Sequence, residues 1–276
     1  REERQEELKR RRQALADKKK TNPAEEPATK EPETKPAVPA TAVSAGDYIK
    51  LENIVCTDAE GKVFENYPEL YVAKDIFRNE KRGQLNFTPH NAVVHCEQNG
   101  LFLPSFALSC NILAVLYRGK KQSDLKAVLE QYKNKGNGTG YHGQNTIIDF
   151  GSQEVIHYPT ARDFSQTTVV NTANRRHTGQ FAKATLQDSL LEKALKDSAN
   201  ERYVKQLTGL TDPTVLVDIG KYFGKPAKLW FPWNGQDSAS YTDKRAAWLG
   251  CNLIDFYNLG AGNYLYSSNA ARGVRR

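Results

Sequence analysis

The last stretch of the chain, Lys228–Arg276, reads KLWFPWNGQDSASYTDKRAAWLGCNLIDFYNLGAGNYLYSSNAARGVRR. Two apolar runs in it, Leu229–Trp233 and Ala246–Phe256, predict strands, because they are short, bulky and bounded by Asn-Gly and Gly clusters. Between and after them Trp, Tyr, Asn, Ser, Asp and Gly dominate, a composition typical of antibody-like binding surfaces. A glycine-rich hairpin with ordinary core aromatics has the same composition, so both interpretations stay open.

The charge and hydropathy of the whole chain restrict its partners. The 276 residues include 39 Lys and Arg and 32 Asp and Glu, for a formal net charge of +7. Residues 1–46 hold 11 basic and 9 acidic residues, and acids and bases are mixed along the remainder. Nucleic-acid-binding proteins concentrate their basic residues in a patch or stripe, so we expect no nucleic acid as a partner. No apolar run approaches the roughly 20 residues of a membrane span, and we expect none in this chain.

The four cysteines, Cys56, Cys96, Cys110 and Cys251, include no C-x-x-C pair. Their spacing indicates neither a structural zinc site nor a redox dithiol. They are also too sparse for a disulfide framework in a domain of this size. We therefore expect Cys96 and Cys110 to be buried free thiols.

Two polar segments precede the globular part. Residues 1–20 have high helix propensity but almost no apolar face, which is typical of a solvated charged helix or tail, with the end of a longer coiled coil as the alternative. Residues 21–46 are rich in Pro, Ala, Thr, Glu and Lys and predict an extended linker. We predict a single globular domain over residues 47–276.

The first part of this domain combines strands with two helices. Strands are predicted at Tyr48–Val55, Val63–Phe64 and Tyr71–Ile76, with a further strand-like run, NAVV, at Asn91–Val94. Ser105 as an N-cap and Gly119 as a stop predict a core helix over Phe106–Arg118. An amphipathic helix is predicted next, over Ser123–Lys133.

The second part adds a hairpin and a helical block. Thr146–Phe150 and Glu154–Tyr158 predict two paired strands. Apolar residues at helical spacing predict a helix over Leu186–Leu207, with a break near Ser198–Asn200. A Thr-Asp-Pro cap at 211–213 predicts a short helix ending near Tyr222.

No residue pattern typical of an active site or a metal centre is visible. The histidines are His90, His95, His142, His157 and His177. None forms an i,i+4 pair, so we expect structural histidines with satisfied hydrogen bonds. The glycine run at 136–140 lacks the G-K-[ST] ending of a phosphate loop, and there is no G-x-S-x-G elbow. We expect no enzyme activity, no cofactor and no metal ion.

Two motifs together resemble one known family. An apolar helix entered through Gly-Leu-Phe-Leu-Pro-Ser (Gly100–Ser105) is combined with a closing Ala-Arg-Gly-Val-Arg (Ala271–Arg275) that follows a strand pair. This combination resembles the C-type lectin fold in its formylglycine-generating-enzyme-like form. In particular, it resembles the variable proteins diversified by diversity-generating retroelements, including archaeal ones. The resemblance covers about residues 47–276 and treats the helical block around Leu186–Tyr222 as an insertion.

The resemblance implies both a fold and a function. The fold is α+β, C-type lectin-like, with two main helices, small antiparallel sheets and a helical insertion. The function is the binding of diverse ligands, expected to be proteins, by a C-terminal variable region of about residues 233–269 that ends in a constant Arg-rich strand. The formylglycine-generating enzymes use a cysteine pair. Cys251 has no cysteine near it in sequence, so that activity is not carried over.

The composition of the C-terminal stretch is consistent with adenine-directed mutagenesis, the process that diversifies this family. This process converts Asn codons to residues such as Tyr, Ser, Asp and Gly, but never to Trp, Lys, Glu or Gln. Residues Gly250–Asn269 contain none of these four. A buried strand also lacks Lys and Glu, so the agreement does not establish diversification. By the same rule Trp230, Trp233, Lys244 and Trp248 are fixed scaffold or rim positions.

In the variable region we expect aromatic side chains to supply contact area and Asn and Asp to supply directional polar contacts. The candidate ligand-binding residues are Trp233, Asn234, Tyr241, Trp248, Asn252, Asp255, Tyr257, Asn258, Asn263, Tyr264 and Tyr266. The expected partner is an unidentified protein or surface ligand. The alternative function is a structural or surface-displayed module of a virion or cell envelope, without diversification. The chain has no Met and starts within a charged run, so it indicates no compartment beyond the cell surface or virion that the resemblance allows.

Overall fold

The computed structural model describes residues 45–81, 83–133, 141–149, 151–159, 177–180, 189–230, 244–251, 257–263 and 271–276. By its internal contacts the chain divides into two units, Arg1–Pro39 and Ala40–Arg276, and every described residue belongs to the second. The charged helix or tail predicted at 1–20 lies outside the described residues, as does nearly all of the linker predicted at 21–46.

A three-stranded antiparallel sheet with the order β1-β2-β10 joins the beginning and the end of the second unit. Its strands are β1 (Tyr48–Thr57), β2 (Val63–Ala73) and β10 (Val274–Arg275), and a short 3-10 helix, η1 (Ala45–Asp47), precedes β1. β10 pairs with β2 through Val274 and Val72. The chain therefore closes on its own first hairpin.

The prediction of two strands at Val63–Phe64 and Tyr71–Ile76 is wrong, because β2 runs continuously between them. Pro68 in the middle of β2 was compatible with a break, since proline cannot donate a hydrogen bond to a neighbouring strand. The ladder between β1 and β2 accommodates it by leaving both Pro68 and Asn53 unpaired. Asn53 adopts a φ of 57°, which lets β1 bend at this point.

Helix α3 (Phe106–Arg118) forms the centre of the core and has the predicted boundaries. The Ser105 hydroxyl accepts a hydrogen bond from the N–H of Leu108 at 3.1 Å and caps the first turn. Nine of the 13 residues of α3 are buried, which explains why the sequence is apolar on nearly every side. Helix α4 (Ser123–Lys133) also has the predicted boundaries.

Helix α2 (Pro89–Gln98) corrects the sequence prediction of a strand-like NAVV run. Thr88 is the N-cap and accepts a hydrogen bond from the N–H of Asn91, and Pro89 occupies the first helical position. Proline is well suited to this position because its missing N–H would have no helical partner there. Ala92 and Val93 face the core, so the run is the buried side of a helix.

The region predicted as a helical insertion contains three helices. They are α5 (Leu191–Ala194), α6 (Ser198–Thr208) and α7 (Thr214–Tyr222). The predicted break near Ser198–Asn200 is displaced, because those residues form the first turn of α6, capped by Asp197. α6 ends at Gly209, whose φ of 62° is the left-handed conformation that glycine adopts without strain.

The second sheet has seven strands in the order β5-β4-β3-β8-β9-β7-β6. Its strands are β3 (Tyr141–Asp149), β4 (Glu154–His157), β5 (His177–Gln180), β6 (Ser189–Leu190), β7 (Ala227–Trp230), β8 (Lys244–Cys251) and β9 (Tyr257–Asn263). The hairpin predicted at 146–158 is confirmed as β3 and β4, which are antiparallel. The sheet departs from the predicted small antiparallel sheets in one pair, because β7 and β9 are parallel.

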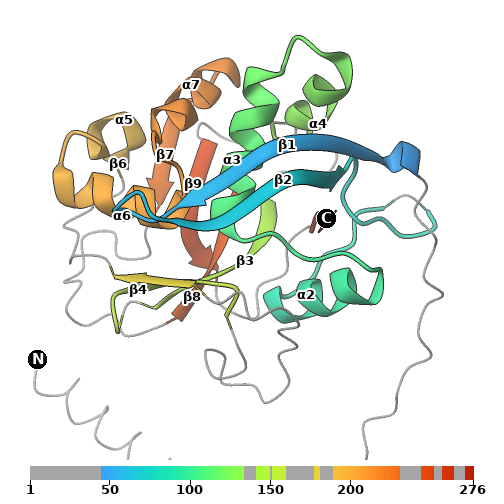
Figure 1. Ribbon diagram of the computed structural model, residues 1–276, viewed down its shortest axis with the longest axis horizontal. Coiled ribbons are helices and arrows are strands. Elements are labelled where there is room, and N and C mark those ends of the chain that lie inside the picture. Colours follow the sequence, from blue (N-terminus) through green and yellow to red (C-terminus); the bar gives the residue numbers. More distant parts are fainter. Residues whose placement is uncertain are drawn as a thin grey trace, which may run out of the picture. The chain divides into compact units, whose positions relative to one another are not determined.

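Helix α3 lies between the two sheets. The β1–β2 hairpin crosses one side of α3 (Figure 1), and the main cluster of buried residues also includes Ile148 of β3 and Leu249 of β8. Helices α6 and α7 contribute Leu207 and Leu216 to the same cluster. A smaller cluster joins α2 to Leu101, Leu103 and the end of the chain. The mixture of helices and sheets establishes the α+β class.

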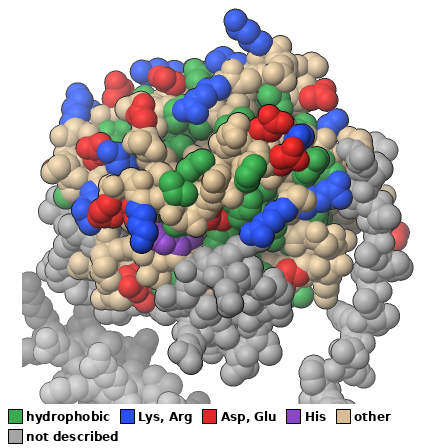
Figure 2. All heavy atoms as spheres, viewed as in Figure 1, with side chains coloured by type: hydrophobic (Ala, Val, Ile, Leu, Met, Phe, Trp, Pro, Cys, Tyr) green, Lys and Arg blue, Asp and Glu red, His purple; other side chains and the backbone are tan. Residues whose placement is uncertain are grey.

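On the face of the domain seen in Figure 2, charged side chains surround exposed hydrophobic ones. Basic and acidic side chains alternate over the face seen in Figure 2, in agreement with the mixed charges of the sequence. Cys56, Cys96 and Cys110 are buried free thiols, which confirms the prediction for the last two. Within the described part of the chain, no helix combines the length and the apolar character that crossing a membrane requires.

Candidate functional site

Strands β8 and β9 contain the four candidate ligand-binding residues that fall within the described part of the chain. Trp248 lies in β8, and Tyr257, Asn258 and Asn263 lie in β9. The structure gives their positions in the sheet. The remaining candidates lie outside the described residues: Trp233, Asn234, Tyr241, Asn252, Asp255, Tyr264 and Tyr266.

The register of β9 separates the candidates into two groups. At its beginning, Tyr257 pairs with Ala227 of β7 and with Cys251 of β8. At its end, Asn263 pairs with Ala246 of β8. A strand rises about 3.3 Å per residue, so the six steps from Tyr257 to Asn263 span about 20 Å. Tyr257 and Asn258 therefore lie at one end of β9 and Asn263 at the other.

The last six residues, Ala271–Arg276, which we call the closing motif, are anchored to the beginning of the domain. Phe102 and Val274 exchange two backbone hydrogen bonds, of 2.8 and 3.0 Å. The N–H of Phe77 donates to the carbonyl oxygen of Ala271 at 3.1 Å. Ala271 and Val274 are fully buried. Phe102 belongs to Gly100–Ser105, so the two motifs that carry the family resemblance contact one another directly.

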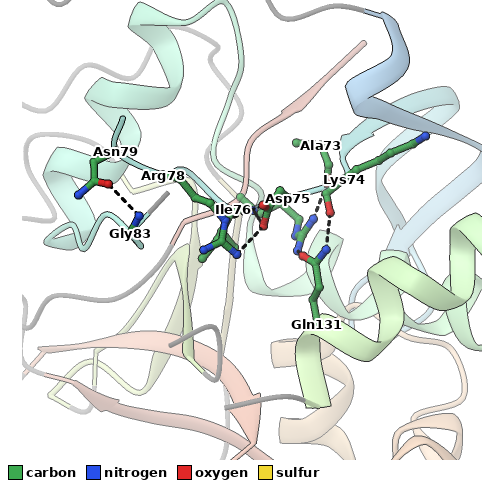
Figure 3. Close-up of polar contacts among 9 residues, drawn as sticks. Ala73, Lys74, Asp75, Ile76, Arg78, Asn79, Gly83 and Gln131 are labelled. Atoms are coloured by element: carbon green, nitrogen blue, oxygen red, sulfur yellow. Dashed lines mark hydrogen bonds and ion pairs between the residues drawn. The ribbon is translucent and has the colours of Figure 1, made fainter. Parts of the chain in front are cut away.

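Arg272 is the most deeply buried charged group of the closing motif, with only 3% of its surface exposed. Its guanidinium donates to the carbonyl oxygen of Ala73, the last residue of β2, and to the side-chain oxygen of Gln131 in α4. Gln131 in turn donates to the carbonyl oxygen of Lys74 at 2.8 Å (Figure 3). Burial lowers the pKa of Arg272, and the nearby Tyr132 and Asp75 oppose this shift. One side chain thus connects the chain end to β2 and α4.

The next two arginines lie on aromatic rings of the first hairpin. The guanidinium carbon of Arg275 is 4.1 Å from the ring centroid of Tyr48 and 5.6 Å from that of Tyr71. The guanidinium of Arg276 is 5.6 Å from the ring centroid of Tyr67. Such cation–π contacts stabilise by about 0.5–1 kcal/mol each at exposed sites. The Arg-rich end is therefore part of the scaffold.

A buried polar cluster surrounds the beginning of α3. The Ser105 hydroxyl lies 3.2 Å from a carboxylate oxygen of Glu65, and the Tyr67 hydroxyl donates to the other carboxylate oxygen at 2.7 Å. The N–H of Ser105 donates to the hydroxyl of Tyr158 at 3.3 Å. Because Ser105 also accepts from Leu108, its hydroxyl serves as a helix cap, and Glu65 places a carboxyl group beside the positive end of the helix.

The thiols near this cluster are poor nucleophiles. Burial raises the pKa of Cys56 well above its ordinary value, and Glu65 and Cys110 raise it further. Burial likewise raises the pKa of Cys110. A thiol in this state is protonated at neutral pH, and the thiolate is the reactive form. Among the described residues, no group of three or more His, Cys, Asp or Glu side chains could hold a metal ion.

Sequence reasoning missed Arg272 and Glu65 as structural residues. The position of Arg272 between Ala271 and Gly273 was a weak signal of burial, because small neighbours permit close packing. The alternation Phe64-Glu65-Asn66-Tyr67 placed Glu65 and Tyr67 on one face of a strand, but gave no partner for the carboxylate.

Comparison of the chain with protein families, with curated proteins and with solved structures finds no match.

Proposed function

We propose that this protein is a ligand-binding protein of C-type lectin-like, formylglycine-generating-enzyme-like fold, whose variable region at about 233–269 is diversified by a retroelement. The region recognises diverse protein ligands through aromatic and small polar side chains. The predicted binding residues and the domain boundaries 47–276 belong to the same proposal.

One observation carries the proposal: the contact between Gly100–Ser105 and the closing motif. These two stretches are about 170 residues apart in sequence, yet Phe102 and Val274 pair through their backbones. A fold in which a constant C-terminal strand returns to the N-terminal part predicts this contact. The pairing of Val274 with Val72 extends it to the first hairpin.

The scaffold also supports a division between fixed and changeable positions. Strand β9 is held by backbone hydrogen bonds to β7 and β8 on both sides, and the closing motif is held by Arg272. Backbone pairing does not depend on which side chain a strand residue carries. Backbone anchors of this kind support a binding surface whose side chains are diversified, because the strand pairing itself carries no requirement for a particular side chain.

Sequencing the gene with its genomic neighbourhood tests the proposal. We expect a near-copy of the segment encoding Trp233–Arg276 that differs mainly at adenines, next to a reverse transcriptase gene. The mismatched codons then identify the binding residues, and codons of the closing motif serve as the internal control because they must match. A gene without such a repeat contradicts diversification, and the undiversified structural or surface-displayed module becomes the better interpretation.

A further inference from the structure

His157 lies at the point where β3, β4, α3 and α6 meet. Its side chain is fully buried. The Nε2 atom is 3.1 Å from the carbonyl oxygen of Gln206, and the Nδ1 atom is 2.9 Å from the hydroxyl oxygen of Thr146. A carbonyl oxygen only accepts, so Nε2 carries the hydrogen and Nδ1 of the neutral ring accepts from Thr146.

The hydroxyl of Thr146 extends this chain of hydrogen bonds to α3. It accepts from the N–H of Phe106, the first residue of the helix, at 2.9 Å. We call this set the His157 relay: the carbonyl of Gln206, the ring of His157, the hydroxyl of Thr146 and the N–H of Phe106. In this relay the N–H of Phe106 donates to the Thr146 hydroxyl, that hydroxyl donates to Nδ1 of His157, and Nε2 donates to the carbonyl oxygen of Gln206. Because Nδ1 must accept a hydrogen bond, the imidazole must be neutral.

The aromatic side of the relay contacts the first hairpin. The ring of Phe64 in β2 is 5.4 Å from that of His157 and 3.9 Å from that of His177, and all three rings are nearly parallel. His177 lies in β5, beside the turn between β1 and β2. The stack therefore joins the edge of the seven-stranded sheet to the three-stranded sheet.

A proton on Nδ1 would oppose this arrangement in three ways. It would bury a charge for which the described residues supply no counter-ion in contact with the ring, and place that charge at the positive end of α3. It would also turn Nδ1 into a donor facing the Thr146 hydroxyl, whose own hydrogen would lose its acceptor. These costs agree with the effect of burial, which lowers the pKa of His157 to about 3.

The surrounding charges do not compensate for that proton. Among the described residues, the titratable group that acts on His157 is His177, and a charge on it would repel a charge on His157. His177 is itself faced by Asp58, Glu60 and Lys62 of the hairpin turn. Glu60 already forms an ion pair with Arg202 of α6.

We propose that the His157 relay is an acid-sensitive latch, which holds α6 and the first turn of α3 against β3 and β4 while the imidazole is neutral and releases them when it is protonated. Strands β4 and β5 are at one edge of the seven-stranded sheet. Release there leaves the pairing of β8 with β9, and that of β1 with β2, intact. This inference does not depend on the proposed function.

The direction of the pH effect follows from the two pKa values. Because the pKa of His157 is lowered in the closed state, the stabilisation is complete above the ordinary value of about 6.5 and is lost as the pH falls below it. Between pH 7.5 and pH 4.5, an open state with the ordinary pKa gains about 100-fold in population relative to the closed state.

Amide hydrogen exchange by NMR, corrected for intrinsic rates, tests the latch on the unmodified protein. We expect the protection of the Phe106 amide to fall about 100-fold between pH 7.5 and pH 4.5, while the β1–β2 amides keep theirs. The His157 ring resonance should remain that of a neutral imidazole over this range, because the pKa of the ring in the closed state is about 3. Unchanged protection of Phe106 would overturn the proposal, as would a ring that titrates near pH 6.5 with the amide still protected.

A pair of variants separates the latch from general acid sensitivity. His157→Gln is uncharged at every pH, so the protection of the Phe106 amide should be the same at pH 7.5 and pH 4.5. His95→Gln, which removes a histidine packed against Phe77 and Phe87 near α2, should lose protection as the unmodified protein does. A 100-fold loss in folded His157→Gln would refute the role of His157. If that variant does not fold, the exchange and titration of the unmodified protein decide.

Discussion

The two sheets of this domain are built in different ways. The three-stranded sheet consists of a long hairpin and the short strand β10, and the buried guanidinium of Arg272 lies just before β10. The seven-stranded sheet has one parallel pair, β7–β9, and two of its strand pairs, β3–β8 and β8–β9, have register shifts, against one in the three-stranded sheet, in β1–β2. Specific side chains hold the first sheet, whereas backbone pairing holds β9 in the second. We infer that a substitution of Arg272 in the closing motif should be costly and that a substitution of Asn258 in β9 should be mild.

Arg272→Ala should cause the largest loss in the free energy of unfolding, because it removes the contacts that hold the closing motif to β2 and α4. The change leaves the carbonyl of Ala73 and the side chain of Gln131 without their buried donor, and removes the packing on Tyr132. We expect a loss of about 3 kcal/mol in the free energy of unfolding, measured by urea denaturation. The exposed Arg276→Ala is the control, at about 0.5 kcal/mol or less. Equal losses for both would contradict the distinction between buried and exposed arginines.

Gly209→Ala tests the packing at the end of α6, where Gly209 accepts a hydrogen bond from the N–H of Thr57. We expect the free energy of unfolding to fall by about 2 kcal/mol. Gly209 has a φ of 62°, and an added Cβ would lie 2.6 Å from the Cβ of Ala107. Gly224 has a similar φ of 72° with open space around it. Gly224→Ala should therefore cost only the backbone strain, about 1 kcal/mol. Thermal unfolding of both variants measures the difference, and equal costs would show that crowding against α3 is unimportant.

Asn258→Ser should have the smallest effect and would sharpen the contrast between the sheets. Asn258 pairs through its backbone with Lys228 and Gly250, and serine keeps this pairing. We expect the free energy of unfolding to change by about 0.5 kcal/mol or less. Ala247→Asn, which places an amide in the core of β8, is the control and should cost about 2 kcal/mol. A large loss for Asn258→Ser would argue against a changeable surface at β9.

Local signals in the sequence were sufficient for several elements. The boundaries of α3 and α4 follow from the Ser105 cap, the Gly119 stop and apolar spacing, because caps and periodicity act within a few residues. The same kind of signal was overlooked at α2, where Thr88-Pro89 is a helix start. Strand β9 was missed because Gly-Ala-Gly has little intrinsic preference for a strand. Its conformation is imposed by β7 and β8 on either side.

The candidate site also contains features that the local sequence predicts and features that only tertiary contacts determine. Composition alone identified the Tyr- and Asn-rich stretch, but it gave no spatial grouping, and the register of β9 is what places Tyr257 and Asn263 at opposite ends of the strand. The burial of Arg272 and Glu65 could not be predicted, because a single charged residue in a sequence does not indicate which residue it will contact. Their partners are about 200 and 40 residues away.

The sequence by itself determined the α+β composition of this protein and the boundaries of its core helix. These features depend on caps, spacing and local composition. Only the tertiary structure decided that the closing motif pairs with β2 and Phe102, that Arg272 is buried, and that His157 connects two strands to two helices. Such contacts join distant parts of the chain, and their free energy depends on burial and geometry that exist only once the chain has folded.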